Sequence, residues 1–224
     1  MRQVTSAAGD GTELRVSAEE LTMPTEQRLV LAAERLFAER GIDAVSLRAV
    51  MAAAGTNVAS VHYHFGSKDA LIEAMIRQRS DSVAARRAAL LDEMESAGAV
   101  SARGLAEAFV VPVWEMATGA GAAWVKFIAG ILGSGHPALS IVADGFTEQA
   151  VRFTALLESV FPTLPRHTVR FRLAQAMTLT FQVLGDVHHT QNLLAISGVR
   201  LTPDQVLTEL LDVVTAILSG PPEI

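Results

Sequence analysis

The chain has 224 residues, of which 50% are hydrophobic and 19% charged, and it contains no cysteine. That length can bury a sizeable apolar core, and the lack of cysteine excludes disulfides and thiolate metal sites. The net charge of -6 argues at first sight against nucleic-acid binding, because cations that contact phosphates dominate affinity for duplex DNA.

The distribution of charge weakens that objection. Residues 24–80 carry seven Lys/Arg and six Asp/Glu, whereas residues 81–224 carry nine and fourteen. Most of the acidity therefore lies outside a candidate DNA-binding segment at 24–80.

The composition also predicts the fold class. Ala, Leu and Val predominate over Tyr and Thr, a balance that favours packed helices over sheet. We expect an all-α protein with an N-terminal three-helix helix-turn-helix domain and a C-terminal helical bundle.

The N-terminal region has no feature of a signal or a membrane segment. Residues 1–23 are poor in large apolar side chains and lack a basic start with an apolar run, so we expect a flexible arm. The longest apolar stretch, Gly119 to Gly135, contains Lys126 and falls short of the roughly 20 apolar residues of a membrane helix. We therefore expect a cytoplasmic protein without a membrane partner.

The next segment predicts three short helices and the start of a fourth. From Thr25 to Gly41 the apolar residues recur with the spacing of an amphipathic helix. Ser46 can cap a helix over Leu47–Ala54, Asn57 can cap Val58–Phe65, and Ser67 can cap a helix beginning at Lys68. Gly55 supplies a tight turn between the second and third of them, which is the arrangement of a helix-turn-helix.

The third of these helices suits a DNA groove. Small residues at Ala59 and Ser60 allow close approach, and the polar residues around them offer donors and acceptors to bases and phosphates. Lys68, at a helix start, is suited to hold a phosphate.

This segment resembles the tetracycline-repressor (TetR) family of regulators. The family signature runs Ala-Gly-Val-Ser, three residues, Leu-Tyr, one residue, His or Tyr, Phe, two residues, Lys, two residues, Leu. Its matches here are Ala54, Gly55, His64, Phe65, Lys68 and Leu71, while Thr56, Asn57, Val61 and His62 depart from it. The resemblance covers residues 25–75 well and implies a ligand-responsive dimer, most often a repressor, on a pseudo-palindromic operator.

The residues and the resemblance together give a candidate DNA-binding set, in which Ser46, Tyr63 and Lys68 are expected to contact phosphates. The full set is Ser46, Arg48, Thr56, Asn57, Val58, Ser60, His62, Tyr63, His64 and Lys68. We also predict three domain ranges: an arm at 1–23, a helix-turn-helix domain at 24–68, and a ligand-binding and dimerisation domain at 69–224.

Beyond Lys68 the Gly and Pro breaks predict helices near 68–95, 101–118, 121–133, 137–160, 166–190 and 203–219. The resemblance implies dimerisation through the last two long helices. An apolar stripe in the last one suits such an interface or packs only within its own chain: Leu207, Leu210, Leu211, Val214 and Leu218.

The C-terminal part offers large, adaptable side chains that could line a pocket for a small apolar or aromatic effector, although core packing explains each of them as well. The candidates are Trp114, Trp124, Phe127, Phe153, Met177 and Phe181.

No motif for enzymatic chemistry occurs, such as Gly-x-Ser-x-Gly, a Walker-type loop or His-Glu-x-x-His. His188 and His189 diverge by about 100° on a helix, and we expect neither a metal site nor a cofactor. The rival hypothesis is a helical protein-interaction module that has lost DNA binding, which the near-neutral charge of 24–80 would allow.

Overall fold

The computed structural model describes residues 22–56 and 64–221, and all regular secondary structure in these ranges is helical. The expectation of an all-α protein is confirmed. In chain order the helices are α1 (Thr25–Arg40), α2 (Leu47–Ala53), α4 (Lys68–Ser96), α5 (Ala102–Thr118), α6 (Ala122–Ser134), α7 (Leu139–Val160), α8 (Arg166–Gly185), α9 (Val187–Ile196) and α10 (Pro203–Ser219).

The predicted stripe of α1 forms the core of the N-terminal part. Leu29, Ala33, Leu36 and Phe37 are all buried. The helix ends at Gly41, whose φ of 78° is cheap only for glycine and whose N–H donates to the carbonyl of Phe37. Sequence periodicity alone therefore located both the helix and its inner face.

Two of the predicted caps are present. The Ser46 hydroxyl accepts a hydrogen bond from the N–H of Ala49 at the start of α2. The Ser67 hydroxyl does the same for the N–H of Ala70 at the start of α4. The third cap, Asn57, and most of the helix predicted over Val58–Phe65 lie outside the described residues.

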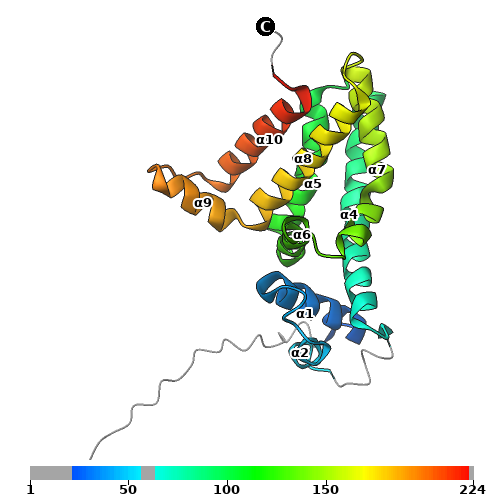
Figure 1. Cartoon of the computed structure of the whole chain (residues 1–224), viewed down its shortest axis with the longest axis vertical. Helices are drawn as coiled ribbons and strands as arrows, with labels where there is room; N and C mark the ends of the chain where they lie inside the picture. The colour runs from blue at the N-terminus through cyan, green and yellow to red at the C-terminus, as the bar shows by residue number, and fades with distance from the viewer. Residues whose placement is uncertain (1–21, 57–63, 222–224) are drawn as a thin grey trace, which may run out of the picture.

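Helix α4 connects the two parts of the molecule. Its 29 residues rise about 43 Å at 1.5 Å per residue. It packs against α1 near its start and against α5 and α7 further along, and it runs the length of the molecule in Figure 1. A displacement of α4 would therefore change packing contacts in both parts of the molecule.

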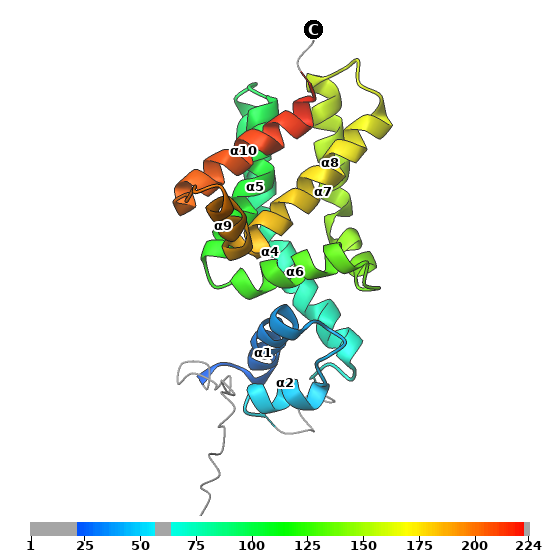
Figure 2. The ribbon, with the colours of Figure 1, turned by 60° about the vertical axis from the view of Figure 1, so that its left-hand side comes forward.

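Helix α6 lies across the junction between the parts. It packs on α8 on one side and on α1 on the other, and Figure 2 shows it between the upper bundle and α1. The Phe37 and Phe127 rings meet across the α1–α6 contact with centroids 5.9 Å apart. The N-terminal part thus rests on α6 as well as on α4.

The single helix predicted over 166–190 is wrong in one respect, because the chain breaks at Asp186. A methyl group built on Gly185 would lie 2.6 Å from the Cβ of Ala129, so α8 approaches α6 closely just where it ends. Asp186 then leaves helical geometry and caps α9 by accepting from the N–H of His189 at 2.9 Å. His188 and His189 consequently lie in the first turn of a new helix.

The apolar stripe of α10 faces inward. Leu210, Leu211, Val214 and Leu218 are buried within the chain and Leu207 is partly buried. Helix α10 packs on α5 and α8, so the intrachain alternative holds for most of the stripe. An interface with a second copy would have to use other side chains.

In the described part of the chain no single helix has the length and apolarity to cross a membrane. Only α6 and α7 taken together pass on these two criteria, and they are bent by 107°.

Candidate functional site: a helix-turn-helix end and a buried arginine cavity

The candidate DNA-binding residues that the structure describes gather at the end of the molecule formed by α1, α2 and the start of α4. Arg48 is exposed on α2, and Ser46 caps the same helix. Thr56 donates its hydroxyl to the carbonyl of Met51 at 3.4 Å. The ring of His64 lies 4.0 Å from the Glu26 carboxylate. Asn57, Val58, Ser60, His62 and Tyr63 lie outside the described residues.

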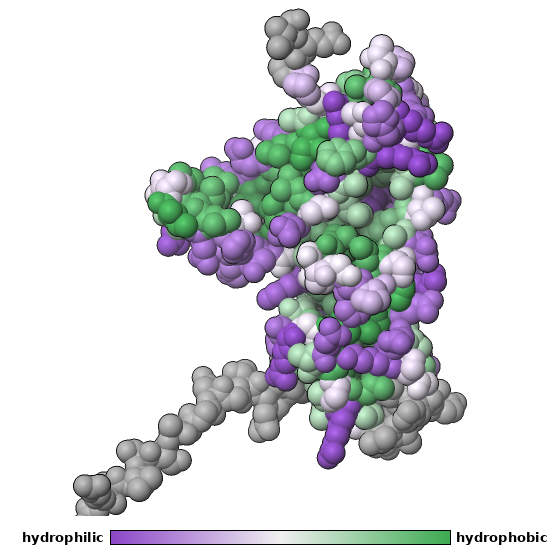
Figure 3. Space-filling model, in the orientation of Figure 1, coloured by the Kyte–Doolittle hydropathy of each residue, from purple (hydrophilic) through white to green (hydrophobic). Residues whose placement is uncertain are grey.

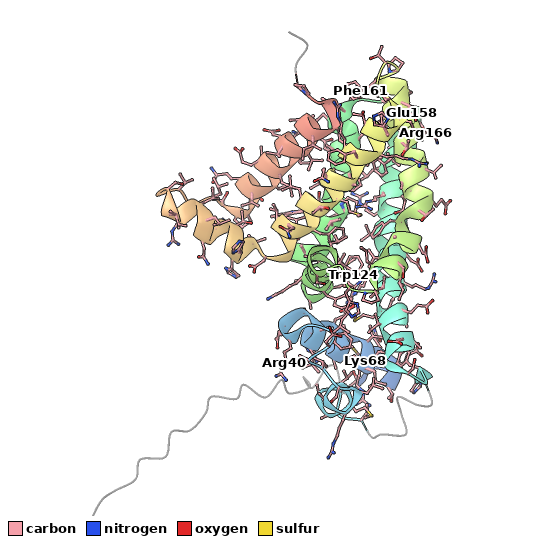
Figure 4. The ribbon with its side chains drawn as sticks, in the orientation of Figure 1. Arg40, Lys68, Trp124, Glu158, Phe161 and Arg166 are labelled. Atoms are coloured by element: carbon pink, nitrogen blue, oxygen red, sulfur yellow. The ribbon has the colours of Figure 1, made fainter. Side chains whose placement is uncertain are left out.

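Lys68 has an intramolecular role that the sequence did not indicate. Its ammonium donates to the carbonyl of Ile42 at 2.6 Å and lies 5.7 Å from the centre of the Phe37 ring. The side chain therefore ties the start of α4 to the loop after α1. In Figure 4, Lys68 and Arg40 lie at the same end of the molecule, below Trp124 of α6.

The C-terminal part contains a cavity of about 320 Å³ between α4, α5, α7 and α8. Most of its wall is apolar, and its deep side is formed by the buried rings of Phe109, Phe146 and Phe153. Its outer side, with exposed Ala143, Val151 and other residues, opens between α7 and α8. This volume lies in the range of small-molecule sites.

A buried arginine is the main polar group of this cavity. Arg87 of α4 is 1% exposed, and its guanidinium lies 4.4 Å from the centre of the Phe109 ring and 5.1 Å from that of Phe146. One terminal nitrogen donates to the carbonyl of Phe109 at 3.0 Å, whereas Nε has no hydrogen-bond partner. Burial lowers the pKa of Arg87 to about 9, which still leaves a cation at neutral pH.

Among the described residues no carboxylate forms an ion pair with Arg87, although its neighbour Arg86 pairs with Glu115 at 3.1 Å on the surface. A second unsatisfied polar atom, Oε1 of Gln149 on α7, belongs to the same cavity wall. Buried polar groups are normally paired. Three other buried atoms of the described residues also lack a hydrogen-bond partner, Arg28 Nε, Ser80 Oγ and Trp124 Nε1, but those residues do not line this cavity.

The predicted effector residues divide among several places. Phe153 and Met177 line the cavity. Trp124 and Phe181 are fully buried and meet edge to face with centroids 6.0 Å apart; neither lines the cavity, although Phe181 packs behind Phe146 of its wall. Phe127 lies at the contact with α1, and Trp114 is half-buried on α5.

Sequence reasoning missed Arg87, although its position gave a signal. The buried face of α4 runs through Ile76, Ser80, Val83, Arg87 and Leu91, at spacings of three and four. An arginine in register with an apolar stripe is the exception that indicates a buried polar site.

A second cavity of about 400 Å³ lies at the junction, lined by the end of α1, the following loop and α6. There His136 Nε2 is 3.6 Å from Asp43 Oδ1, joining the loop before α7 to the loop after α1. In the part of the chain covered by the structure, no three His, Asp or Glu side chains come together as a metal site.

Two family models match this chain. Residues 29–75 match the model of the bacterial regulatory proteins of the tetR family, and residues 107–216 match the tetracyclin repressor-like C-terminal domain. The first range contains every described candidate for DNA contact, and the second contains most of the cavity wall.

Individual relatives are more distant. The HTH-type transcriptional regulator UidR of Escherichia coli is 35% identical over 63 residues, which cover 28% of this chain and 32% of UidR. The match therefore spans about a third of the length of that curated relative.

Solved structures share the whole fold. A TetR-family transcriptional regulator from Streptomyces coelicolor aligns with a TM-score of 0.60 at 20% identity, covering 92% of this chain and 97% of its own. The ketosteroid transcriptional regulator KstR2 of Mycobacterium tuberculosis aligns with a TM-score of 0.60 at 21% identity, covering 86% and 94%.

Proposed function

This chain belongs to the TetR family of transcriptional regulators, whose members are DNA-binding transcription factors rather than enzymes, and we propose that it is a ligand-responsive repressor acting as a homodimer. The observation that carries the proposal is that one continuous helix, α4, joins the end of the molecule matched by the tetR-family model to a cavity whose buried cation pairs with no carboxylate among the described residues. We also propose the cytoplasmic location that the sequence predicts.

The DNA contacts that we propose are those predicted from the sequence. Arg48 is exposed on α2 and has no intrachain partner recorded among the described residues, so it is available for a phosphate. Lys68 uses part of its donor capacity on Ile42, but an ammonium has three N–H groups and can serve a phosphate as well. Two recognition helices one turn of B-DNA apart, roughly 34–36 Å, would read a pseudo-palindrome.

The proposed domain ranges are 24–68 for DNA binding and 69–224 for ligand binding and dimerisation, with residues 1–23 as an arm. Helix α4 begins at Lys68 and packs in both parts, which supports a boundary at the start of a shared helix and not in a linker. Because one helix belongs to both parts, it can couple ligand binding in the cavity to DNA binding at the other end.

Coupling would pass along two connections. Helix α4 carries Arg87 in the cavity and Lys68 at the DNA-binding end. Helix α7 lines the cavity, and the loop before it meets the loop after α1 through His136 and Asp43. A ligand that binds better with α4 and α7 in one arrangement shifts the protein toward it by that difference in affinity.

Dimerisation would use the exposed face of α8 and α10 instead of the buried stripe. Phe171 on α8 is 66% exposed and Val213 on α10 is 47% exposed, although both are apolar. Figure 3 shows hydrophobic side chains on the face that carries these helices and at the tip of α9. Pairing this face across a two-fold axis would cover them.

The test is binding of the purified chain to the DNA upstream of its own gene at several salt concentrations. Saturable, sequence-selective binding that weakens steeply with salt supports the regulator. Arg48→Ala should reduce affinity and the salt slope, whereas Arg200→Ala, an exposed change in the loop before α10, should not. Salt-insensitive or absent binding at this and other operator candidates would favour an interaction module instead.

A further inference from the structure

The cavity bounded by α4, α5, α7 and α8 holds a cation that pairs with no carboxylate of the described residues. Arg87 is buried, and among the described residues its guanidinium contacts one backbone carbonyl and two aromatic rings. A guanidinium has five N–H donors in a planar fork, so most of its hydrogen-bonding capacity is unused here. Its Nε in particular has no acceptor.

Burying the Arg87 guanidinium with these contacts alone is unfavourable unless an anion pairs with it. A buried charge is normally paired, and the carbonyl of Phe109 neutralises none of the charge. The two ring faces attract the cation but do not accept its in-plane N–H groups. A planar anion, in contrast, can take two parallel N–H groups of the fork at once.

The rest of the wall defines the other part of the ligand. Phe109, Phe146 and Phe153 surround the deep end, and Leu173 and Met177 extend the apolar wall along α8. Gln149 adds one polar amide with an unpartnered oxygen. Arg170, at the exposed side of the wall, is a second cation at the entrance.

We propose that this cavity binds a monocarboxylate with an apolar aliphatic or aromatic body, its carboxylate paired with Arg87. The proposal deepens the proposed function, since it names the chemical class of the effector and rests on the cavity being the effector site. It also adds an anionic group to the small apolar or aromatic effector that the sequence predicts.

The polarity of the cavity fixes the orientation of the ligand. Arg87 lies at the buried end, so the carboxylate enters first and the apolar body occupies the space along α7 and α8. The opening between these helices, where Val151 is 56% exposed, leaves room for bodies of different length. Discrimination is therefore stricter for the head group than for the tail.

The experiment compares head groups on matched bodies. Octanoate, decanoate and 4-phenylbutyrate are titrated calorimetrically into the full chain beside the three corresponding alcohols. At least one carboxylate should bind at least tenfold more tightly than its alcohol, because only the anion pairs with the guanidinium. Equal affinity of each acid and its alcohol, or no binding by any of the six, overturns the proposal.

Two variants assign the effect to Arg87. Arg87→Met keeps a long apolar side chain, and it should lower carboxylate affinity at least tenfold while leaving alcohol affinity unchanged. Arg86→Met removes the neighbouring surface arginine and should change neither. Arg87→Lys keeps the charge without the fork and should give an intermediate affinity. If Arg87→Met, shown to be folded by circular dichroism, binds carboxylates as wild type does, Arg87 is a structural residue and the proposal fails.

Binding of operator DNA by the ligand-free protein is measured in parallel. Selective DNA binding without any response to carboxylates leaves the regulator standing and removes only the effector class. Carboxylate binding that depends on Arg87 in a chain that does not bind DNA would keep the ligand site and reject the regulator.

Discussion

At the scale of single residues, the buried charge of Arg87 lowers the stability of the ligand-free protein and provides a binding position for an anion. Replacing a buried charged group by a well-packed apolar side chain of similar length is often stabilising. We therefore expect Arg87→Met to raise the free energy of unfolding of the ligand-free protein by about 1–3 kcal/mol. Urea unfolding at pH 7 would measure it, with Arg86→Met expected within about 0.5 kcal/mol of wild type because exposed pairs contribute little.

A loss of stability in Arg87→Met would contradict this reasoning. It would mean that the hydrogen bond to Phe109 and the two ring contacts outweigh the desolvation of the guanidinium. The same burial that lowers the pKa of Arg87 to about 9 makes that outcome unexpected.

Lys68 combines two roles that a second pair of substitutions separates. Lys68→Met should lower DNA affinity and also lower stability by about 1–2 kcal/mol, because the carbonyl of Ile42 loses a charged donor. Arg48→Met, exposed on α2, should lower DNA affinity with stability unchanged. Thermal unfolding beside DNA titration measures both effects, and an unchanged stability in Lys68→Met would show that the tie to Ile42 is not significant.

At the scale of helices, the elements with strong local signals were predictable. Apolar periodicity located α1, and Ser46 and Ser67 marked the starts of α2 and α4 because serine caps act within three residues. The break at Asp186 was missed, although Gly185 and Asp186 form a local signal for a helix end and a new cap. The approach of α8 to Ala129, far away in the sequence, had no such signal. Local propensity contains no information about such a contact.

That contact gives a test at the end of α8. Gly185→Ala would bring a methyl group to 2.6 Å from the Cβ of Ala129 and should destabilise the chain by about 1–3 kcal/mol. Gly130→Ala, in α6 with nothing within 4 Å of the new methyl, should instead be neutral or stabilising by up to about 1 kcal/mol. Equal effects of the two in urea unfolding would show that α8 and α6 separate easily there.

The contact between α1 and α4 contains a buried ion pair. Glu34 is 1% exposed and accepts from Arg79 at 3.1 Å, and Arg79 also donates to the carbonyl of Ala120 at 3.3 Å. Burial raises the pKa of Glu34, and Arg79 offsets part of that rise. Arg79→Met leaves the carboxylate buried and unpaired, so stability should fall by on the order of 3 kcal/mol at neutral pH.

The pH dependence of this variant follows from the raised pKa. The folded state binds the proton of Glu34 more tightly than the unfolded state does. The stability gained from protonated Glu34 is therefore fully present below pH 4.5 and is lost as pH rises through the folded pKa. The deficit of Arg79→Met should therefore grow with pH above about 4.5 in urea unfolding. Adding Glu34→Gln should remove most of that pH dependence, and a deficit independent of pH would assign the effect to the Ala120 contact instead.

At the scale of the whole molecule, the two halves of the candidate site differ in how far the sequence predicts them. The DNA-binding candidates follow one another along 46–68, so a local motif with fixed spacing was sufficient to propose them. The cavity draws Arg87, Phe109, Phe146, Phe153 and Met177 from four helices. Of these, only Phe153 and Met177 were proposed, because the size of a side chain shows that it can line a pocket but not which pocket.

Assembly is a property of the whole molecule and has its own test. The apolar stripe of α10 is buried, so a second copy can meet only what remains exposed, including Phe171 on α8. Phe171→Glu should dissociate the proposed dimer without unfolding the chain, since that side chain is already 66% exposed in the single protomer. DNA affinity should fall with it, because one recognition helix alone loses the second half-site.

The matched control for this substitution is Ile196→Glu, which places the same charge at a side chain 83% exposed on α9. If the α8–α10 face pairs, light scattering after gel filtration should show a monomer for Phe171→Glu and a dimer for Ile196→Glu. The reverse pattern would move the interface to α9 and require a different separation of the two DNA-binding ends. Since that separation must match one turn of duplex or a multiple of it, the position of the dimer contact also decides which operator spacing the protein can read.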